Sequence, residues 1–237
     1  MSTIDLRKQI VREISLAKKI QDVKAQVVVV MDYSGSMDHL YNNGFVQRLI
    51  ERLVPVAMQF DDNGEMEMYM FHNSSMKHKN AITESNVSGI VNREITPNYR
   101  FGGTSYAPPI NDIIKDYFSV TEKKSFFGLK SSTSGSTSTD PVYVIFITDG
   151  QNDDQRDAER AIREASKHGA FFQFVGIGNA RLDFLEKLDD LDGRVIDNAN
   201  FFQANDLDKM SDKELYDKML TEFPTWLKEA KAKGIIA

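Results

Sequence analysis

The chain has 237 residues, of which 41% are hydrophobic and 27% are charged. At roughly 150 residues per domain this length predicts one or two domains, and the composition is that of a globular protein rather than of a disordered, collagen-like or coiled-coil chain. The formal net charge of −6 argues against nucleic-acid binding, which needs a basic surface.

The chain contains no cysteine, which excludes disulfides, thiol nucleophiles and zinc–cysteine or iron–sulfur sites. Asp5, Arg7 and Lys8 interrupt the N-terminal segment, so it lacks the apolar stretch of a signal peptide. The longest apolar stretch, residues 27–31, is too short to span a bilayer. We therefore expect no membrane span and a cytoplasmic protein.

Apolar periodicity predicts strands and helices that alternate along the chain. The β-branched run at 25–31 has no polar face, which is typical of a strand buried on both sides of a parallel sheet. Further strands are predicted at 66–71, 142–147, 171–177 and 194–202, with a short edge strand at 80–83. Helical spacing predicts helices at 46–57, 87–95, 107–118, 157–168, 183–191 and 215–223, and a last helical turn after Pro224.

This order of elements indicates an α/β fold. We expect a central, mostly parallel sheet with one antiparallel edge strand and helices on both faces. One domain over residues 25–237 is predicted, preceded by an N-terminal extension of residues 1–24 that fits either a helix or an extended arm. Eight of the nine residues at 131–139 are Ser or Thr, so this segment is expected to form a mobile loop.

Polar side chains follow two of the apolar strands and also open one helix. Asp32, Ser34 and Ser36 come after the first strand, and Asp149 comes after the strand at 142–147. The segment Gly-Gly-Thr-Ser, with Thr104 as its third residue, precedes the helix at 107–118. Because ligands of open α/β sheets bind at the carboxyl ends of the strands, we expect these side chains to share one edge.

All five side chains offer oxygen ligands, which suit Mg²⁺ and also Mn²⁺ or Ca²⁺. Two carboxylates balance a divalent charge, and the neutral hydroxyls leave the ion able to accept one more carboxylate oxygen from outside. Each motif alone would fit helix capping or a simple turn. Their occurrence together, each at a strand end or a helix start, favours a metal site that holds an acidic partner.

The motifs Asp-Tyr-Ser-Gly-Ser-Met, Gly-Gly-Thr-Ser-Tyr and Ile-Thr-Asp-Gly resemble the metal-ion-dependent adhesion site (MIDAS) of von Willebrand factor type A (vWA) domains. The longer segments at 40–47, 101–108 and 146–150 resemble the bacterial tellurium-resistance (TerF-type) vWA proteins. This resemblance implies a Rossmann-like vWA fold and a bacterial, cytoplasmic stress-response setting. It also implies a role in protein–protein interaction rather than catalysis, with the five oxygen-bearing residues at the metal positions.

The neighbours of the predicted metal ligands are candidates for contact with a protein partner that supplies an Asp or Glu. Exposed aromatic side chains beside a metal would be effective anchors. The candidates are Tyr33, Gly103, Ser105, Tyr106, Gly150 and Gln151. Three further acids, Asp153, Asp154 and Asp157, are predicted to cap the helix at 157–168 or to lie in its first turn.

Two enzymatic alternatives remain weaker. A Mg²⁺-dependent, phosphatase-like phosphoryl-transfer enzyme would need an acidic residue where Ser34 stands. A Ser-His-Asp hydrolase would be expected to carry a Gly-x-Ser-x-Gly turn, which this chain lacks. Gly176-Ile177-Gly178 fails as a dinucleotide loop because Arg181 occupies the third glycine position.

Overall fold

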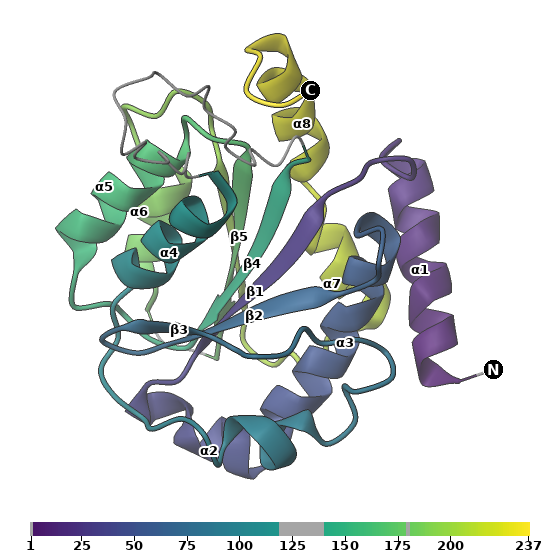
Figure 1. Cartoon of the computed structure of the whole chain (residues 1–237), viewed down its shortest axis with the longest axis vertical. Coiled ribbons are helices and arrows are strands. Elements are labelled where there is room, and N and C mark those ends of the chain that lie inside the picture. Colours follow the sequence, from purple (N-terminus) through teal and green to yellow (C-terminus); the bar gives the residue numbers. More distant parts are fainter. Residues whose placement is uncertain (1, 119–139, 179–180) are drawn as a thin grey trace, which may run out of the picture.

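The computed structural model describes residues 2–118, 140–178 and 181–237. The Ser/Thr-rich segment 131–139 lies outside the described residues. Six strands form one sheet in the order β3-β2-β1-β4-β5-β6, and β3 runs antiparallel to its neighbour β2 while the other pairs are parallel (Figure 1). The predicted α/β architecture, Rossmann-like with one antiparallel edge strand, is confirmed.

The elements have the following bounds. The strands are β1 Gln26–Asp32, β2 Met66–Phe71, β3 Ser75–Lys77, β4 Val142–Thr148, β5 Ala170–Ile177 and β6 Ala199–Ala204. The longer helices are α1 Thr3–Ala17, α3 Phe45–Phe60, α4 Ala107–Phe118, α5 Gln155–Ala165, α7 Asp212–Met219 and α8 Phe223–Ala232. The shorter ones are α2 Asp38–Asn42, α6 Asp183–Asp189, the 3₁₀ turn η1 Gly35–Met37 and the π-helical turn η2 Val91–Ile95.

The sheet separates two apolar layers. Val27, Val29 and Met31 of β1 pack into the layer that also contains buried residues of α1, α3, α7 and α8. Val28 and Val30 point to the other layer, which α4, α5 and α6 cover. Side chains alternate between the faces of a strand, so the unbroken apolar sequence of β1 fills both layers. Figure 1 shows α4, α5 and α6 on one side of the sheet and α1, α3 and α7 on the other.

The N-terminal extension is a helix rather than an extended arm. Ser2 and Asp5 form a reciprocal capping box at the start of α1. Val11 and Ile14 are buried against the layer formed by α3 and α7, and Arg7 Nε lies 3.0 Å from a carboxylate oxygen of Asp212. The extension therefore packs onto the domain along its length.

Two predicted strands are shifted in the structure. The antiparallel edge strand is β3 at 75–77 and not 80–83, because the chain reverses directly after β2, where His72 N–H donates to Ser74 O. Ile82 forms only an isolated pair with Met66. The last strand begins at Ala199 rather than at 194, since the Arg194 side chain is engaged with carbonyl groups at the end of α6.

Pro224 starts a helix rather than ending one. It occupies the first turn of α8, where its missing N–H costs nothing. None of the helices in the described ranges is both long and apolar enough to cross a membrane.

Candidate metal centre

The loops that carry the five predicted metal ligands meet at the carboxyl edge of the sheet. Asp32 is the last residue of β1, and Asp149 directly follows β4, which is the neighbour of β1 in the sheet. The loop with Thr104 joins them, because Gly35 N–H donates to Gly102 O over 3.0 Å and Ser34 pairs with Gly102 like a short parallel strand. Segments about 70 residues apart in sequence are thus joined by backbone hydrogen bonds.

Hydrogen bonds connect four of the predicted ligand residues in series, and the first of these bonds involves the backbone N–H of Ser34. Asp32 Oδ1 accepts from the Ser34 N–H over 2.7 Å. The Ser34 and Ser36 hydroxyl oxygens are 3.0 Å apart, and Ser36 Oγ donates to Asp149 Oδ1 over 2.7 Å. This series therefore gathers two carboxylates and two hydroxyls in one place, and such oxygen atoms are the donors that hard divalent cations prefer.

Asp32 is fully buried beneath this set. Its Oδ2 accepts from Thr148 Oγ1 over 2.5 Å, a partner that the sequence analysis did not identify. Burial raises the pKa of Asp32 to about 6, and the charge of Asp149 adds to that rise. A buried carboxylate with only neutral donors around it is an environment that a cation would favour.

The Gly-Gly-Thr loop is held from the side of β2 by a turn that also escaped the sequence analysis. Asn73 Oδ1 accepts from Gly103 N–H over 2.7 Å, and Ser105 N–H donates to His72 O. A β-carbon on Gly103 would lie 2.6 Å from Asn73 Nδ2. A side chain at position 103 would therefore displace the Asn73 side chain and break its hydrogen bond to the Gly103 N–H, which explains the glycine.

The loop after β4 holds the other side of Thr104, whose side chain is largely buried. Asp153 N–H donates to Thr104 O over 2.8 Å. The Asp154 carboxylate accepts from the N–H groups of Tyr106 and Ala107, over 2.9 and 2.8 Å. The Asp154 side chain therefore caps α4, which lies on the other side of the candidate centre. The prediction that it caps the following helix, α5, is wrong.

Asp157 does lie in the first turn of the helix α5, which begins at Gln155 and not at 157. Its carboxylate is exposed and faces Arg160 on the next turn. Asp154 is thus the acid that holds the loop of Thr104 in place, and Asp157 is a surface residue.

Two residues predicted to contact a partner lie under the surface instead. Tyr33 and Tyr106 are each 1% exposed, so the expectation of direct partner contact is not supported for either. Tyr33 stacks on Phe101 with ring centroids 4.2 Å apart, and Tyr106 donates its hydroxyl to Gly150 O over 2.5 Å. Both rings support the loops from below.

The surface around the site is formed by other residues. Gly103, Ser105 and Gly150 are half-buried, and Gln151 is exposed. Phe101, which the sequence analysis did not single out, exposes 37% of its surface directly before the Gly-Gly pair. A large apolar residue between Arg100 and a glycine pair, outside any periodic pattern, is the signal that could have identified it.

The oxygen set fits a divalent cation of the hard type. No group of three or more His, Asp or Glu side chains within the described ranges converges as a metal site. The candidate centre differs from such clusters, because it has two carboxylates and completes its donors with hydroxyls. Its chemistry favours Mg²⁺ or Ca²⁺ over metals that prefer imidazole or thiolate.

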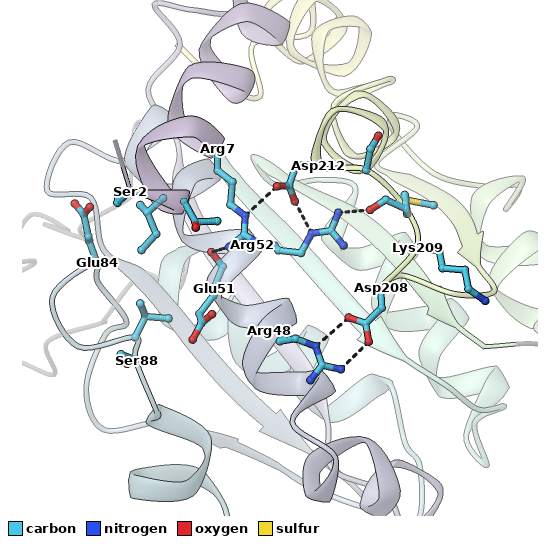
Figure 2. A pocket seen from close by; sticks show the side chains of 15 residues that line it. Ser2, Arg7, Arg48, Glu51, Arg52, Glu84, Ser88, Asp208, Lys209 and Asp212 are labelled. Carbon is cyan, nitrogen blue, oxygen red and sulfur yellow. Dashed lines mark hydrogen bonds and ion pairs between the residues drawn. The ribbon is translucent and has the colours of Figure 1, made fainter.

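A separate pocket of about 760 Å³ lies between α1, α3 and the loop before α7 (Figure 2). Arg48 forms two bonds to Asp208, and Arg52 bonds Asp212 over 2.6 Å. Four basic and four acidic side chains line the pocket. Because these charges balance and the Arg48 and Arg52 guanidinium groups are paired, we interpret it as the junction that fastens α1 and α7 to α3.

Comparison with known proteins decides the family. A family model described as the vWA domain found in the C terminus of TerF matches residues 24–236. The chain belongs to the vWA-TerF-like family. An uncharacterized protein of Bacillus subtilis (strain 168), YcbR, is 42% identical over 239 residues, which cover all of this chain and 91% of that protein.

Solved structures share the fold of this vWA-TerF-like chain at low sequence identity. Proximal thread matrix protein 1 of the mussel byssus, in a form with a zinc-occupied MIDAS motif, superposes with a TM-score of 0.56 and 15% identity over 84% of the chain. The chain spans 46% of that protein. The conserved hypothetical protein BatB of Bacteroides thetaiotaomicron gives a TM-score of 0.53 and 15% identity, over 88% of this chain and 99% of that one.

Proposed function

We propose that this vWA-TerF-like protein is a metal-dependent protein-interaction module. Asp32, Ser34, Ser36, Thr104 and Asp149 hold a divalent cation, with Mg²⁺ as the first candidate and Mn²⁺ or Ca²⁺ as the others. The cation then binds an Asp or Glu carboxylate of a protein partner. The observation that carries this proposal is the series of hydrogen bonds that joins Asp32 to the Ser34 N–H, the Ser34 hydroxyl to the Ser36 hydroxyl, and the Ser36 hydroxyl to Asp149.

The exposure of the site supports an external ligand. Asp32 and Ser34 are buried, whereas Ser36 is exposed and Asp149 is half-exposed. The set of oxygens therefore has a closed lower side and an open upper side. Because Mg²⁺ normally has six oxygen ligands and retains exchangeable waters, an incoming carboxylate could replace a water on the open side.

The geometry gives no support to hydrolysis at this edge. The His39 ring contacts the backbone carbonyl of Ser36, with 2.9 Å between Nδ1 and O, and not a serine hydroxyl. Ser36 Oγ donates directly to Asp149. A serine nucleophile needs a base such as histidine on its hydroxyl, so we propose binding and no catalytic residue.

The family relation supports a setting for this module. We propose that it acts in the bacterial cytoplasm, in a stress-response or tellurium-resistance-related system, and that its partner is a protein and not a nucleic acid. The similarity to TerF-type vWA domains and to the Bacillus protein supports this proposal.

Calorimetric titration of the full chain with Mg²⁺, Mn²⁺ and Ca²⁺ tests the metal site. We expect uptake by the wild type and none at millimolar concentration by the Ser34→Ala/Ser36→Ala double variant. A Ser85→Ala/Ser88→Ala double variant, which removes two hydroxyls from another segment, should titrate like the wild type. Circular dichroism in EDTA should show the same fold for all three.

Partner capture tests the second half of the proposal. Wild-type protein should retain a partner from cells that produce it in Mg²⁺ and release it in EDTA, and the Ser34→Ala/Ser36→Ala variant should not retain it. Retention that survives both EDTA and the double substitution would show that the metal does not hold the partner.

A further inference from the structure

A second pocket opens directly beside the metal centre. It has a volume of about 380 Å³, and Asp149 lines it as well as taking part in the oxygen set. Leu40, Phe45 and Leu207 supply apolar walls, and Asp206 lies at the exposed end. If a partner's carboxylate binds the proposed metal, a neighbouring side chain of that partner would lie close to this pocket.

The charge around the pocket favours a cation. Two of its described lining residues, Asp149 and Asp206, are carboxylates, none is Lys or Arg, and the remaining titratable one is His39, whose Nδ1 lies 2.9 Å from Ser36 O. Lys209 lies 2.7 Å from Asp206, but its side chain is 85% exposed. Exposed ion pairs of this kind are weak, so a cation brought by a partner can compete with Lys209 for Asp206.

The proposed metal does not reverse this balance. A divalent cation held by the two carboxylates of Asp32 and Asp149 is formally neutral, and the partner's own carboxylate then adds one negative charge. That charge would lie beside Asp149, and Asp206 adds a second negative charge to the lining of the same pocket. Its apolar walls, in turn, suit the methylene stem of a long basic side chain, which buries its stem and keeps its charged end near water.

We propose that the partner presents a Lys or Arg close to the metal-bound Asp or Glu, with the basic side chain in the pocket between Leu40, Phe45 and Leu207 and its charge at Asp206. This inference rests on the proposed function. In an extended segment, residues two apart point to the same side and lie about 6.6 Å from each other. The recognised motif is therefore an acidic and a basic residue separated by one residue.

Selection from a displayed library of linear hexapeptides, with Asp fixed at the third position and the other five random, tests this motif. The immobilised full chain is loaded with Mg²⁺, and bound peptides are eluted with EDTA. We expect Lys or Arg to be enriched at the first or the fifth position. The affinity of the best enriched peptide is then measured by fluorescence polarisation.

The variant Asp206→Asn should weaken that peptide about two- to fivefold, the range of an exposed ion pair, and leave an Asp peptide with a neutral neighbour unchanged. Asp208→Asn is the matched control, because it removes the same charge from the same loop but faces Arg48 in the other pocket (Figure 2). It should leave both peptides unchanged.

The outcomes separate the two levels of the proposal. EDTA-eluted peptides with an apolar residue or no preference beside the Asp, or equal effects of Asp206→Asn and Asp208→Asn, would overturn the basic-residue pocket and leave the metal-dependent function standing. A library with no EDTA-eluted peptides would overturn the proposed function and this inference with it.

Discussion

Replacing Asp154 with alanine is expected to destabilise the loop that carries Thr104. The Asp154 carboxylate accepts from two N–H groups at the start of α4 and from Asn152 Nδ2 over 2.7 Å. Loss of a capping side chain costs about 0.5–2 kcal/mol, and hydrogen bonds to a charged group contribute about 1.5–3 kcal/mol. Because Asp154 is only partly buried, water can replace some of these bonds, and we expect a loss of about 2–3 kcal/mol.

For a chain of this size, 1 kcal/mol corresponds to about 2–4 °C in Tm, so Asp154→Ala should melt roughly 4–12 °C below the wild type in EDTA. Urea unfolding should give the free-energy difference directly. Asp157→Ala is the control, because its carboxylate is 61% exposed and pairs only with an exposed arginine. It should change stability by less than about 0.5 kcal/mol. Equal losses for the two variants would refute the capping role across the site.

Three further predictions concern metal, packing and pH. Mg²⁺ at about 100 times its Kd should stabilise the wild type by about 2.7 kcal/mol, and a thermal melt of the Ser34→Ala/Ser36→Ala variant should show no such gain. Arg52→Ala should cost about 3 kcal/mol in urea unfolding, because it removes the largely buried guanidinium that donates to Asp212 and to two carbonyls and leaves Asp212 with Arg7; a loss under 1 kcal/mol would contradict this. Burial and neighbouring carboxylates raise the pKa of Asp189 to about 7, above its unfolded value near 4, so its charge opposes folding as the pH rises from 4 to 7. Asp189→Asn should therefore be increasingly more stable than the wild type between pH 4.5 and 8, and a constant difference would count against it.

Most interior strands could be predicted because each has one unambiguous pattern in the sequence, whereas the pattern does not give the order of the strands in the sheet. Residues 27–31 and 142–147 are apolar on both faces, which few structures other than a central strand accommodate. The short strand at 75–77 has no such pattern, since it pairs along only one side. Its position depends on the tight turn after β2, which a backbone hydrogen bond from His72 to Ser74 closes. The spacing of apolar residues in the sequence does not reveal such a turn.

The candidate ligands could be proposed from the sequence because they stand at strand ends or directly before a helix, positions that need no knowledge of contacts. Their supports were not. His72, Asn73 and Asp154 act on a loop 30 to 50 residues away in sequence, and only the folded chain brings them there. Tyr33 shows the converse error: it is next to Asp32 in sequence, but successive side chains of an extended chain point in opposite directions, so its ring lies under the surface.

The same contacts would allow the proposed metal site to bind strongly through few exposed atoms. Tyr106 donates to Gly150 O, Thr148 donates to Asp32, and Asp32 accepts from Ser34, so buried bonds fix the lower side of the site from α4 to the end of β1. A site that is already organised does not spend binding energy on ordering its own loops. If the proposed cation binds a partner's carboxylate, more of the free energy gained would then be available for affinity, and the open side would need only Ser36, Asp149 and the residues around them.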